Sequence, residues 1–337
     1  MSLKSWKTIS PNSDFSIHNI PFGIYSDASV KHAACSAIGD EIIDLKELAQ
    51  NGFFKDIHPQ LTEIFSKPYL NDFIALGKSV TFAVRKRIQE LLSDNNNELK
   101  SAHHLYNRIF KPISSVKMLL PIEIGDYTDF YSSEYHATNV GKMFRDPNNA
   151  LLPNWKHLPV GYHGRSSSIF VSPHSFYRPN GQTKPADSDK PIFGPSKLLD
   201  FELETAFVVG KSTQQGEVIP VNKAKDYIFG MLLFNDWSAR DIQTWEYQPL
   251  GPFLAKNFAS TISPWIVTLE ALEPFYIPAS PQSPEPLPYL KQEPLQNLDI
   301  SLEVILKTSD GVETTICRSN TKILILDNGT TVSTSHY

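Results

Sequence analysis

Four acidic residues in this chain stand beside apolar or aromatic sequence, where an uncompensated carboxylate is costly. They are Asp129, Glu202, Glu204 and Asp236. Residues 198–209 are predicted to form a strand, so Glu202 and Glu204 should project from one face, about 7 Å apart along it. A hard divalent cation with oxygen ligands, calcium or magnesium, is the natural partner of such a cluster. The alternative for Glu-x-Glu alone is a pair of solvent-facing glutamates on an amphipathic strand.

A histidine and several cationic or amide side chains complete a possible catalytic set. His136 follows Asp129 by seven positions and is a candidate general base toward water, because imidazole titrates near neutral pH. The alternative is an ordinary hydrogen-bonded histidine.

A negatively charged substrate would need cationic and polar partners, and the chain offers them at Arg145, Arg240, Gln243, Tyr247 and Lys256. Arg240 and Gln243 are three positions apart, so they share one face of a predicted helix (238–245). Lys256 lies in apolar sequence and should be partly buried against a charged partner. Ordinary surface salt bridges are the alternative for each residue taken alone.

The composition limits the class of protein. The 337 residues suffice for two domains or one large one, and the net charge of −5 gives no basic footprint for nucleic acid. No apolar run approaches the roughly 20 residues of a membrane span. Cys35 and Cys317 have no metal-ligand spacing, and the N-terminus lacks a signal-peptide core, so we expect a cytoplasmic protein.

The pattern of apolar residues predicts a mainly β protein with some α structure, divided near residue 121. The N-terminal part is expected to hold strands at 21–26 and 34–45, a hairpin turn at Gly39-Asp40 and a helix near 80–92. Further strands are expected at 199–209, 228–235 and 298–306 in the remainder. The proline-rich segment 274–294 is expected to cross the surface, anchored by Phe275, Tyr276 and Tyr289.

Several long motifs resemble one known family. They are Gly125-Asp-Tyr-Thr-Asp-Phe-Tyr-Ser-Ser133, Leu158-Pro-Val-Gly-Tyr-His-Gly-Arg165, Lys197-Leu-Leu-Asp-Phe-Glu-Leu-Glu204, Asn235-Asp-Trp-Ser-Ala-Arg-Asp-Ile-Gln243 and Leu250-Gly-Pro-Phe-Leu254. Together they resemble the fumarylacetoacetase family, and a weaker likeness extends over most of the chain. The resemblance implies an N-terminal SH3-like β-barrel (1–121), a C-terminal catalytic β-roll (122–322), incomplete in this chain, and a homodimer.

The resemblance also implies roles for individual residues. The calcium ligands would be Asp129, Glu202, Glu204 and Asp236. His136 would be the catalytic base. The groups that stabilise the departing fragment would be Arg240, Gln243 and Lys256. The substrate contacts would be Tyr131, Arg145, Tyr162, Gln243 and Tyr247. A magnesium site would use Asp236, Lys256 and Ser260, and Ser260 stands where the family usually has threonine.

The activity implied by the resemblance is metal-dependent hydrolysis of a carbon–carbon bond in 4-fumarylacetoacetate. The products would be fumarate and acetoacetate, as in tyrosine and phenylalanine catabolism. The alternatives are another oxo-acid enzyme of the same superfamily (a decarboxylase, hydratase or isomerase) or an inactive, truncated product.

The last residues, from Ile323 to Tyr337, do not resemble the family. Codons for this tail can be chosen so that the same bases, read one position later, give Tyr-Leu-Tyr-Trp-Thr-Met-Ala-Gln-Gln-Leu-Ala-His-His-Thr, which resembles the family's next segment. We therefore expect a change of reading frame after about Lys322. It would remove C-terminal strands and the glutamate that orients His136, and the orienting carboxylate matters greatly in related catalytic sets.

Overall fold

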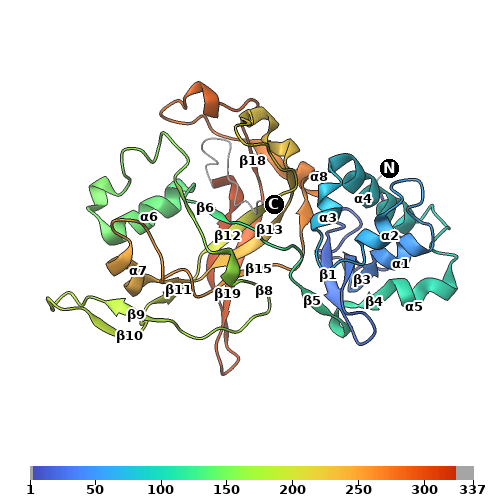
Figure 1. Cartoon of the computed structure of the whole chain (residues 1–337), viewed down its shortest axis with the longest axis horizontal. Coiled ribbons are helices and arrows are strands. Elements are labelled where there is room, and N and C mark those ends of the chain that lie inside the picture. Colours follow the sequence, from blue (N-terminus) through green and yellow to red (C-terminus); the bar gives the residue numbers. More distant parts are fainter. Residues whose placement is uncertain (1–2, 324–337) are drawn as a thin grey trace.

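The computed structural model describes residues 3–323, so the predicted out-of-frame tail lies outside the described residues from position 324 onward. The N-terminal residues form one side of the molecule and the later residues the other (Figure 1). Within the described part, no helix is both long enough and apolar enough to cross a membrane.

The N-terminal side is built on a five-stranded antiparallel sheet. Its strands, in spatial order, are β4 (Phe110–Pro112), β3 (Glu41–Asp44), β2 (Ala33–Ile38), β1 (Gly23–Ser26) and β5 (Lys117–Leu119). The predicted hairpin joins β2 to β3, and its turn needs a glycine because Gly39 has a φ of 62°.

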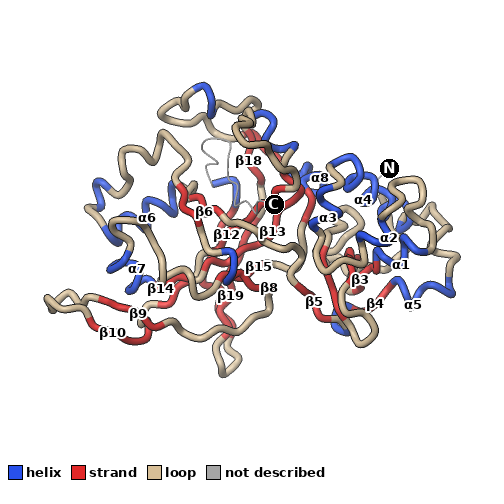
Figure 2. The backbone as a smooth tube through the Cα atoms, in the orientation of Figure 1, coloured by secondary structure: helices blue, strands red, loops and turns tan. Residues whose placement is uncertain are grey.

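Helices surround this sheet (Figure 2): α1 (Leu45–Gln50), α2 (Leu61–Ile64), α3 (Asn71–Ala75), α4 (Lys78–Leu92) and α5 (Tyr106–Ile109). The helix predicted near 80–92 is thus confirmed as α4. Helix α1 begins directly after β3 because the buried carboxylate of Asp44 accepts a hydrogen bond from the backbone N–H of Glu47 at 2.9 Å.

The second large sheet carries part of the predicted site. Its strands are β12 (Leu203–Val209), β13 (Ile228–Asp236), β15 (Ser260–Ile262) and β8 (Ile169–Val171), with β16 (Val267–Thr268) also paired to β13. The prediction of one continuous strand over 199–209 was wrong. The chain leaves β11 (Leu199–Asp200), which pairs with β14 (Ser238–Ala239), and enters β12 only at Leu203. This break lets Asp200 and Glu202 both reach Arg240.

Four smaller strand pairs complete the described β structure: β6 (Thr128–Phe130) with β7 (Gly161–His163), β9 (Asn180–Thr183) with β10 (Ile192–Pro195), β17 (Tyr276–Pro278) with β18 (Gln296–Leu298), and β19 (Ser301–Lys307) with β20 (Glu313–Asn320). The remaining α-helices are α6 (Glu134–Phe144), α7 (Arg240–Glu246) and α8 (Leu269–Leu272). The strand expected at 298–306 is therefore β19 with the end of β18. After Val304 the pairing register shifts, and Ile305 and Leu306 are exposed.

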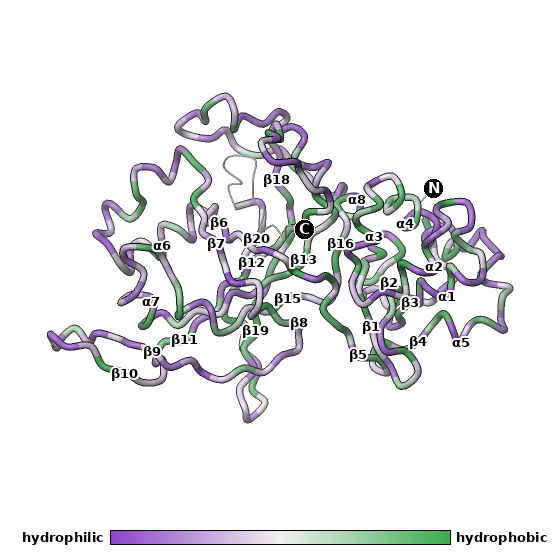
Figure 3. Tube along the Cα trace, viewed as in Figure 1, coloured by the Kyte–Doolittle hydropathy of each residue, from purple (hydrophilic) through white to green (hydrophobic). Residues whose placement is uncertain are grey.

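One hydrophobic core joins the two sides of the molecule. The ring of Phe22 lies 5.1 Å from that of Phe73 and 5.9 Å from that of Phe229, which belongs to β13. The backbone of Phe22 also exchanges hydrogen bonds with Ile266 at 2.9 and 2.8 Å. Figure 3 shows apolar segments, in green, along β1, β2 and β13. Each fully buried side chain of this kind contributes about 1.5–3 kcal/mol, so the core holds the site-bearing sheet against the N-terminal sheet.

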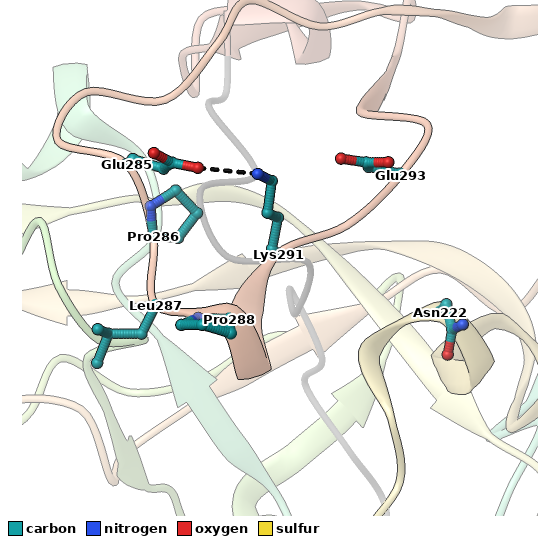
Figure 4. Close-up of a pocket in the computed structure, with 7 residues that line it drawn as sticks. All are labelled: Asn222, Glu285, Pro286, Leu287, Pro288, Lys291 and Glu293. Atoms are coloured by element: carbon teal, nitrogen blue, oxygen red, sulfur yellow. Dashed lines mark hydrogen bonds and ion pairs between the residues drawn. The ribbon is translucent and has the colours of Figure 1, made fainter.

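A surface hollow lies away from the predicted site. It has a volume of 690 Å³ and is lined by Asn222 and the loop 285–293, across which Lys291 and Glu285 form an ion pair at 2.8 Å (Figure 4). The anchoring predicted for this proline-rich segment holds for Tyr276, which packs in a small core beside β13. It was wrong for Phe275 and Tyr289, which lie in short 3-10 helices and are 47% and 66% exposed.

Candidate active site and metal centre

The predicted carboxylates come together where several strands end. Asp129 lies in β6, Asp236 ends β13, and Glu202 immediately precedes β12. Carboxylate oxygens of these three residues lie within 4.8 Å of one another, and all three side chains are buried. Sheet pairing thus places groups more than a hundred positions apart in the sequence around one small volume.

Glu204 lies beside this group but outside it. It belongs to β12 and is paired with Phe234 of β13. Burial raises the pKa of its carboxyl well above the ordinary value, and the charges of Asp129, Glu202 and Asp236 raise it further. Glu204 is therefore close enough to interact electrostatically with the cluster, although its ligand oxygens are not among the three that converge.

Lys256 is the internal counter-charge of the cluster. Its Nζ lies 2.5 Å from Glu202 Oε2 and 2.7 Å from Asp236 Oδ2, and its side chain is 6% exposed. Ser260, paired with Asp236 across β13 and β15, donates its hydroxyl to Asp236 Oδ1 at 2.7 Å. Burial by itself would lower the pKa of Lys256, but the neighbouring carboxylates outweigh it and raise this pKa. The sequence-based prediction of a buried lysine with a charged partner is confirmed.

Arg240 connects the cluster to helix α7, which it begins. Its Nη1 donates to Glu202 Oε1 at 2.7 Å and to Gln243 Oε1 at 3.2 Å, as expected for residues one helical turn apart. Its Nε donates to Asp200 Oδ2 at 2.8 Å. Sequence reasoning missed Asp200, although its place two positions before Glu202 was a usable signal.

His136 lies in the first turn of α6, where its backbone N–H is capped by the hydroxyl of Ser133 at 3.2 Å. Its Nε2 is 3.8 Å from Glu202 Oε1, which is longer than a hydrogen bond. Burial lowers the pKa of this imidazole, and Glu202 offsets part of the effect. The neutral imidazole, which can accept a proton, is therefore favoured near neutral pH.

The predicted substrate-binding residues have different surroundings. The ring of Tyr131 packs edge-on against His136 at 5.5 Å, and burial raises the pKa of its hydroxyl to about 12. The hydroxyl of Tyr162 lies 3.5 Å from Asp236 Oδ2. Arg145 donates two hydrogen bonds, at 2.9 and 2.7 Å, to the carbonyl of Ala150.

Tyr247 directly follows α7, and its backbone N–H donates to the carbonyl of Gln243 at 3.0 Å. Tyr131 and Tyr162 thus lie against the carboxylate cluster and its histidine. The two side-chain hydrogen bonds of Arg145 described above go to the nearby backbone carbonyl of Ala150.

The charges at the site suit a divalent cation. Among the described residues, the carboxyls of Asp129, Glu202, Glu204 and Asp236 outnumber the cationic side chains beside them, Lys256 and Arg240, and Arg240 also pairs with Asp200. Burial and the neighbouring carboxylates raise the pKa of Asp129 to about 7, whereas Lys256 and Arg240 outweigh burial and lower that of Glu202 to about 2. The donor set is oxygen only, which fits calcium or magnesium and not a soft metal.

A buried carboxylate centre beside a neutral histidine and paired cations is typical of a metal-dependent hydrolase. Residues 18–121 match the family described as "Fumarylacetoacetase N-terminal", and residues 127–335 match "Fumarylacetoacetate (FAA) hydrolase C-terminal". The chain belongs to the fumarylacetoacetase family, a family of hydrolases.

Similar proteins support this assignment. The chain is 50% identical to a fumarylacetoacetase of Bos taurus over 323 residues, which are 95% of this chain and 77% of that protein. It is 52% identical to one of Dictyostelium discoideum over 313 residues, 91% of this chain and 72% of that protein. Among solved structures, a fumarylacetoacetate hydrolase of Exiguobacterium antarcticum is 13% identical with a TM-score of 0.47, covering 94% of this chain and 87% of that one.

Proposed function

We propose that this protein is a fumarylacetoacetase, which hydrolyses 4-fumarylacetoacetate to fumarate and acetoacetate in tyrosine and phenylalanine catabolism. The observation that carries the proposal is the buried group of Asp129, Glu202 and Asp236 with Lys256 bridging two of its members. Family membership and the identity to curated relatives support the substrate. The expected binding partner is thus a small diketo acid, and the chain's net negative charge gives no support to nucleic acid binding.

The side chains divide the reaction between them. Water adds to the carbonyl carbon of the fumaroyl group, and the carbon–carbon bond to the acetoacetate fragment then breaks. Neutral His136 accepts the proton of the water. The bonding electron pair leaves with acetoacetate as an enolate, which Arg240, Gln243 and Lys256 stabilise before a proton neutralises it. A bound divalent cation supplies Lewis acidity toward the diketone.

We infer two cation sites. Calcium would be held by Asp129, Glu202, Glu204 and Asp236, and magnesium would lie near Asp236, Lys256 and Ser260. The oxygen donors and the excess of carboxyl groups over cationic side chains support this assignment. The substrate carboxylates would be met by Arg145 with Tyr131, and by Tyr162, Gln243 and Tyr247.

The larger arrangement follows the family resemblance. We propose an SH3-like barrel over 1–121, a catalytic β-roll over 122–322, a homodimer and a cytoplasmic location. We also propose that the reading frame changes after about Lys322. Sequencing the coding DNA there tests this last point, and a clean frame without a downstream open reading frame would contradict it.

A substrate panel tests the function. The protein is incubated with fumarylacetoacetate and with related oxo-acids, with calcium or with a chelator, and fumarate and acetoacetate are measured. Turnover of an oxo-acid but not of fumarylacetoacetate would favour a decarboxylase, hydratase or isomerase. Calcium binding without any turnover would favour the alternative of an inactive, truncated product.

A further inference from the structure

One buried hydroxyl beside the carboxylate cluster has no partner. The side chain of Tyr127 is 5% exposed, and its hydroxyl finds no hydrogen bond in the described part of the chain. Leaving such a group buried and unpaired costs about 1–3 kcal/mol. Buried polar groups are satisfied in most proteins, so this one calls for a physical reason.

The ring of Tyr127 is held in place on two sides. One face stacks on Phe234 with centroids 5.4 Å apart and planes inclined by 24°. Gly164 lies against the ring, where a Cβ atom would come within 2.0 Å of its Cδ1 and Cε1. The backbone N–H of Gly164 also donates to the carbonyl of Tyr127 at 2.9 Å. The hydroxyl therefore cannot reach water by a simple swing of the ring.

A possible acceptor for this hydroxyl, the carboxylate of Glu204, lies on the same face of the β12–β13 sheet as Phe234. Phe234, on which Tyr127 stacks, is directly opposite Glu204 in the pairing of β13 with β12, and such partners have Cβ atoms about 4.5–5.5 Å apart. The carboxylate of Glu204 accepts no hydrogen bond from the described residues. A tyrosine hydroxyl keeps its proton at neutral pH, so Tyr127 can act as an O–H donor.

We propose that Tyr127 is a positioning residue for the cation site: its O–H donates to one oxygen of Glu204 when the cation is bound, and the other oxygen is thereby directed to the cation. The proposal rests on the proposed calcium site, of which Glu204 is a predicted ligand. It explains why a tyrosine is buried here without a partner and why a glycine faces it. Hydrogen-bond partners of this kind typically change metal affinity 10–100-fold.

The test is the isosteric variant Tyr127→Phe, which keeps the stacked ring and removes only the hydroxyl. Calcium binding to the purified protein is measured by isothermal titration calorimetry, and thermal unfolding is followed in a chelator. We expect calcium affinity to fall at least tenfold, while the unfolding temperature in chelator stays equal or rises. A lowered unfolding temperature in chelator would show that the hydroxyl is already paired without the cation, and would overturn the proposal.

Thr268 supplies a matched control, because its buried hydroxyl is also unpartnered but lies on β16, outside the site. Thr268→Val should leave calcium affinity within twofold. A double-mutant cycle adds a second measurement: once Glu204→Gln is present, Tyr127→Phe should weaken calcium binding no further. Additive losses would overturn the link between Tyr127 and Glu204.

The role of Tyr127 and the calcium site itself can be tested separately. Calcium affinity within twofold of the unaltered protein in Tyr127→Phe would overturn only the role of Tyr127. Absence of calcium binding by the unaltered chain would overturn the proposed metal site and this proposal with it.

Discussion

Replacing Lys256 by methionine should destabilise the cation-free protein and make its stability depend strongly on calcium. The ammonium group of Lys256 contacts both Glu202 and Asp236 while almost wholly buried. Methionine keeps most of the length and the apolar stem but removes the charge. Removing one partner of a buried ion pair leaves an uncompensated charge and costs about 3–5 kcal/mol.

The size of the expected thermal shift follows from the length of the chain. Unfolding entropy is about 2.1 cal/mol/K per residue, which gives about 0.7 kcal/mol/K for 337 residues. A loss of 3–5 kcal/mol therefore lowers the unfolding temperature by about 4–7 °C in a chelator. Calcium would neutralise the same carboxylates, so in saturating calcium the difference between Lys256→Met and the unaltered protein should shrink to less than half.

Differential scanning calorimetry in chelator and in calcium measures both differences. The control is Lys291→Met, which breaks the exposed ion pair with Glu285 in the surface hollow of Figure 4. Exposed pairs contribute about 0–1 kcal/mol, so this control should shift the unfolding temperature by less than about 2 °C in either buffer. An equal difference for Lys256→Met with and without calcium would refute the idea that lysine and cation balance the same carboxylates.

Three further predictions concern protons, packing and catalysis. Because the pKa of Asp129 is raised to about 7, the cation-free site holds a proton at pH 6 that calcium must displace. Calcium affinity should therefore fall about tenfold from pH 8 to pH 6. A pH-independent affinity measured by calorimetry would count against this competition between proton and calcium. Gly230→Ala would place a Cβ 2.5 Å from the carbonyl oxygen of Val267 and should lower the free energy of unfolding by about 1–3 kcal/mol. The control Gly194→Ala, where a Cβ would meet open space, should change it by less than about 0.5 kcal/mol. Equal urea midpoints for the two variants would disprove the packing argument. Arg240→Lys should lower kcat at least tenfold because an ammonium group cannot reproduce the fork that joins three acceptors, and an unchanged kcat would remove this residue from the mechanism.

Local patterns were enough to predict the elements around the site. The apolar run ending at Asp236 became β13, the segment after it became α7, and Gly39 formed the predicted turn. These features depend on local properties of the sequence, such as the spacing of apolar residues or a glycine that can adopt a positive φ.

The features that sequence reasoning missed depend on contacts between distant segments. The break between β11 and β12 cannot be seen in the sequence pattern of residues 199–209. It depends on the pairing of β11 with β14 and on the hydrogen bonds that Arg240 donates to Asp200 and Glu202. The exposure of Ile305 similarly reflects which surfaces lie nearby, which no local period encodes. The convergence of Asp129 with Asp236 was expected from the family resemblance and not from spacing.

The shared core around Phe22 limits how the gene could be divided. Phe22, Phe73 and Phe229 touch in pairs, and the backbone of Phe22 is hydrogen-bonded to Ile266 from the far part of the chain. A fragment ending at residue 121 would present Phe22 and Phe73 to water, and its complement would expose β13 with Phe229. Each fragment alone would expose apolar surface and aggregate, but the two exposed surfaces are complementary. Co-expressed fragments should therefore reassemble, whereas separately expressed fragments should precipitate.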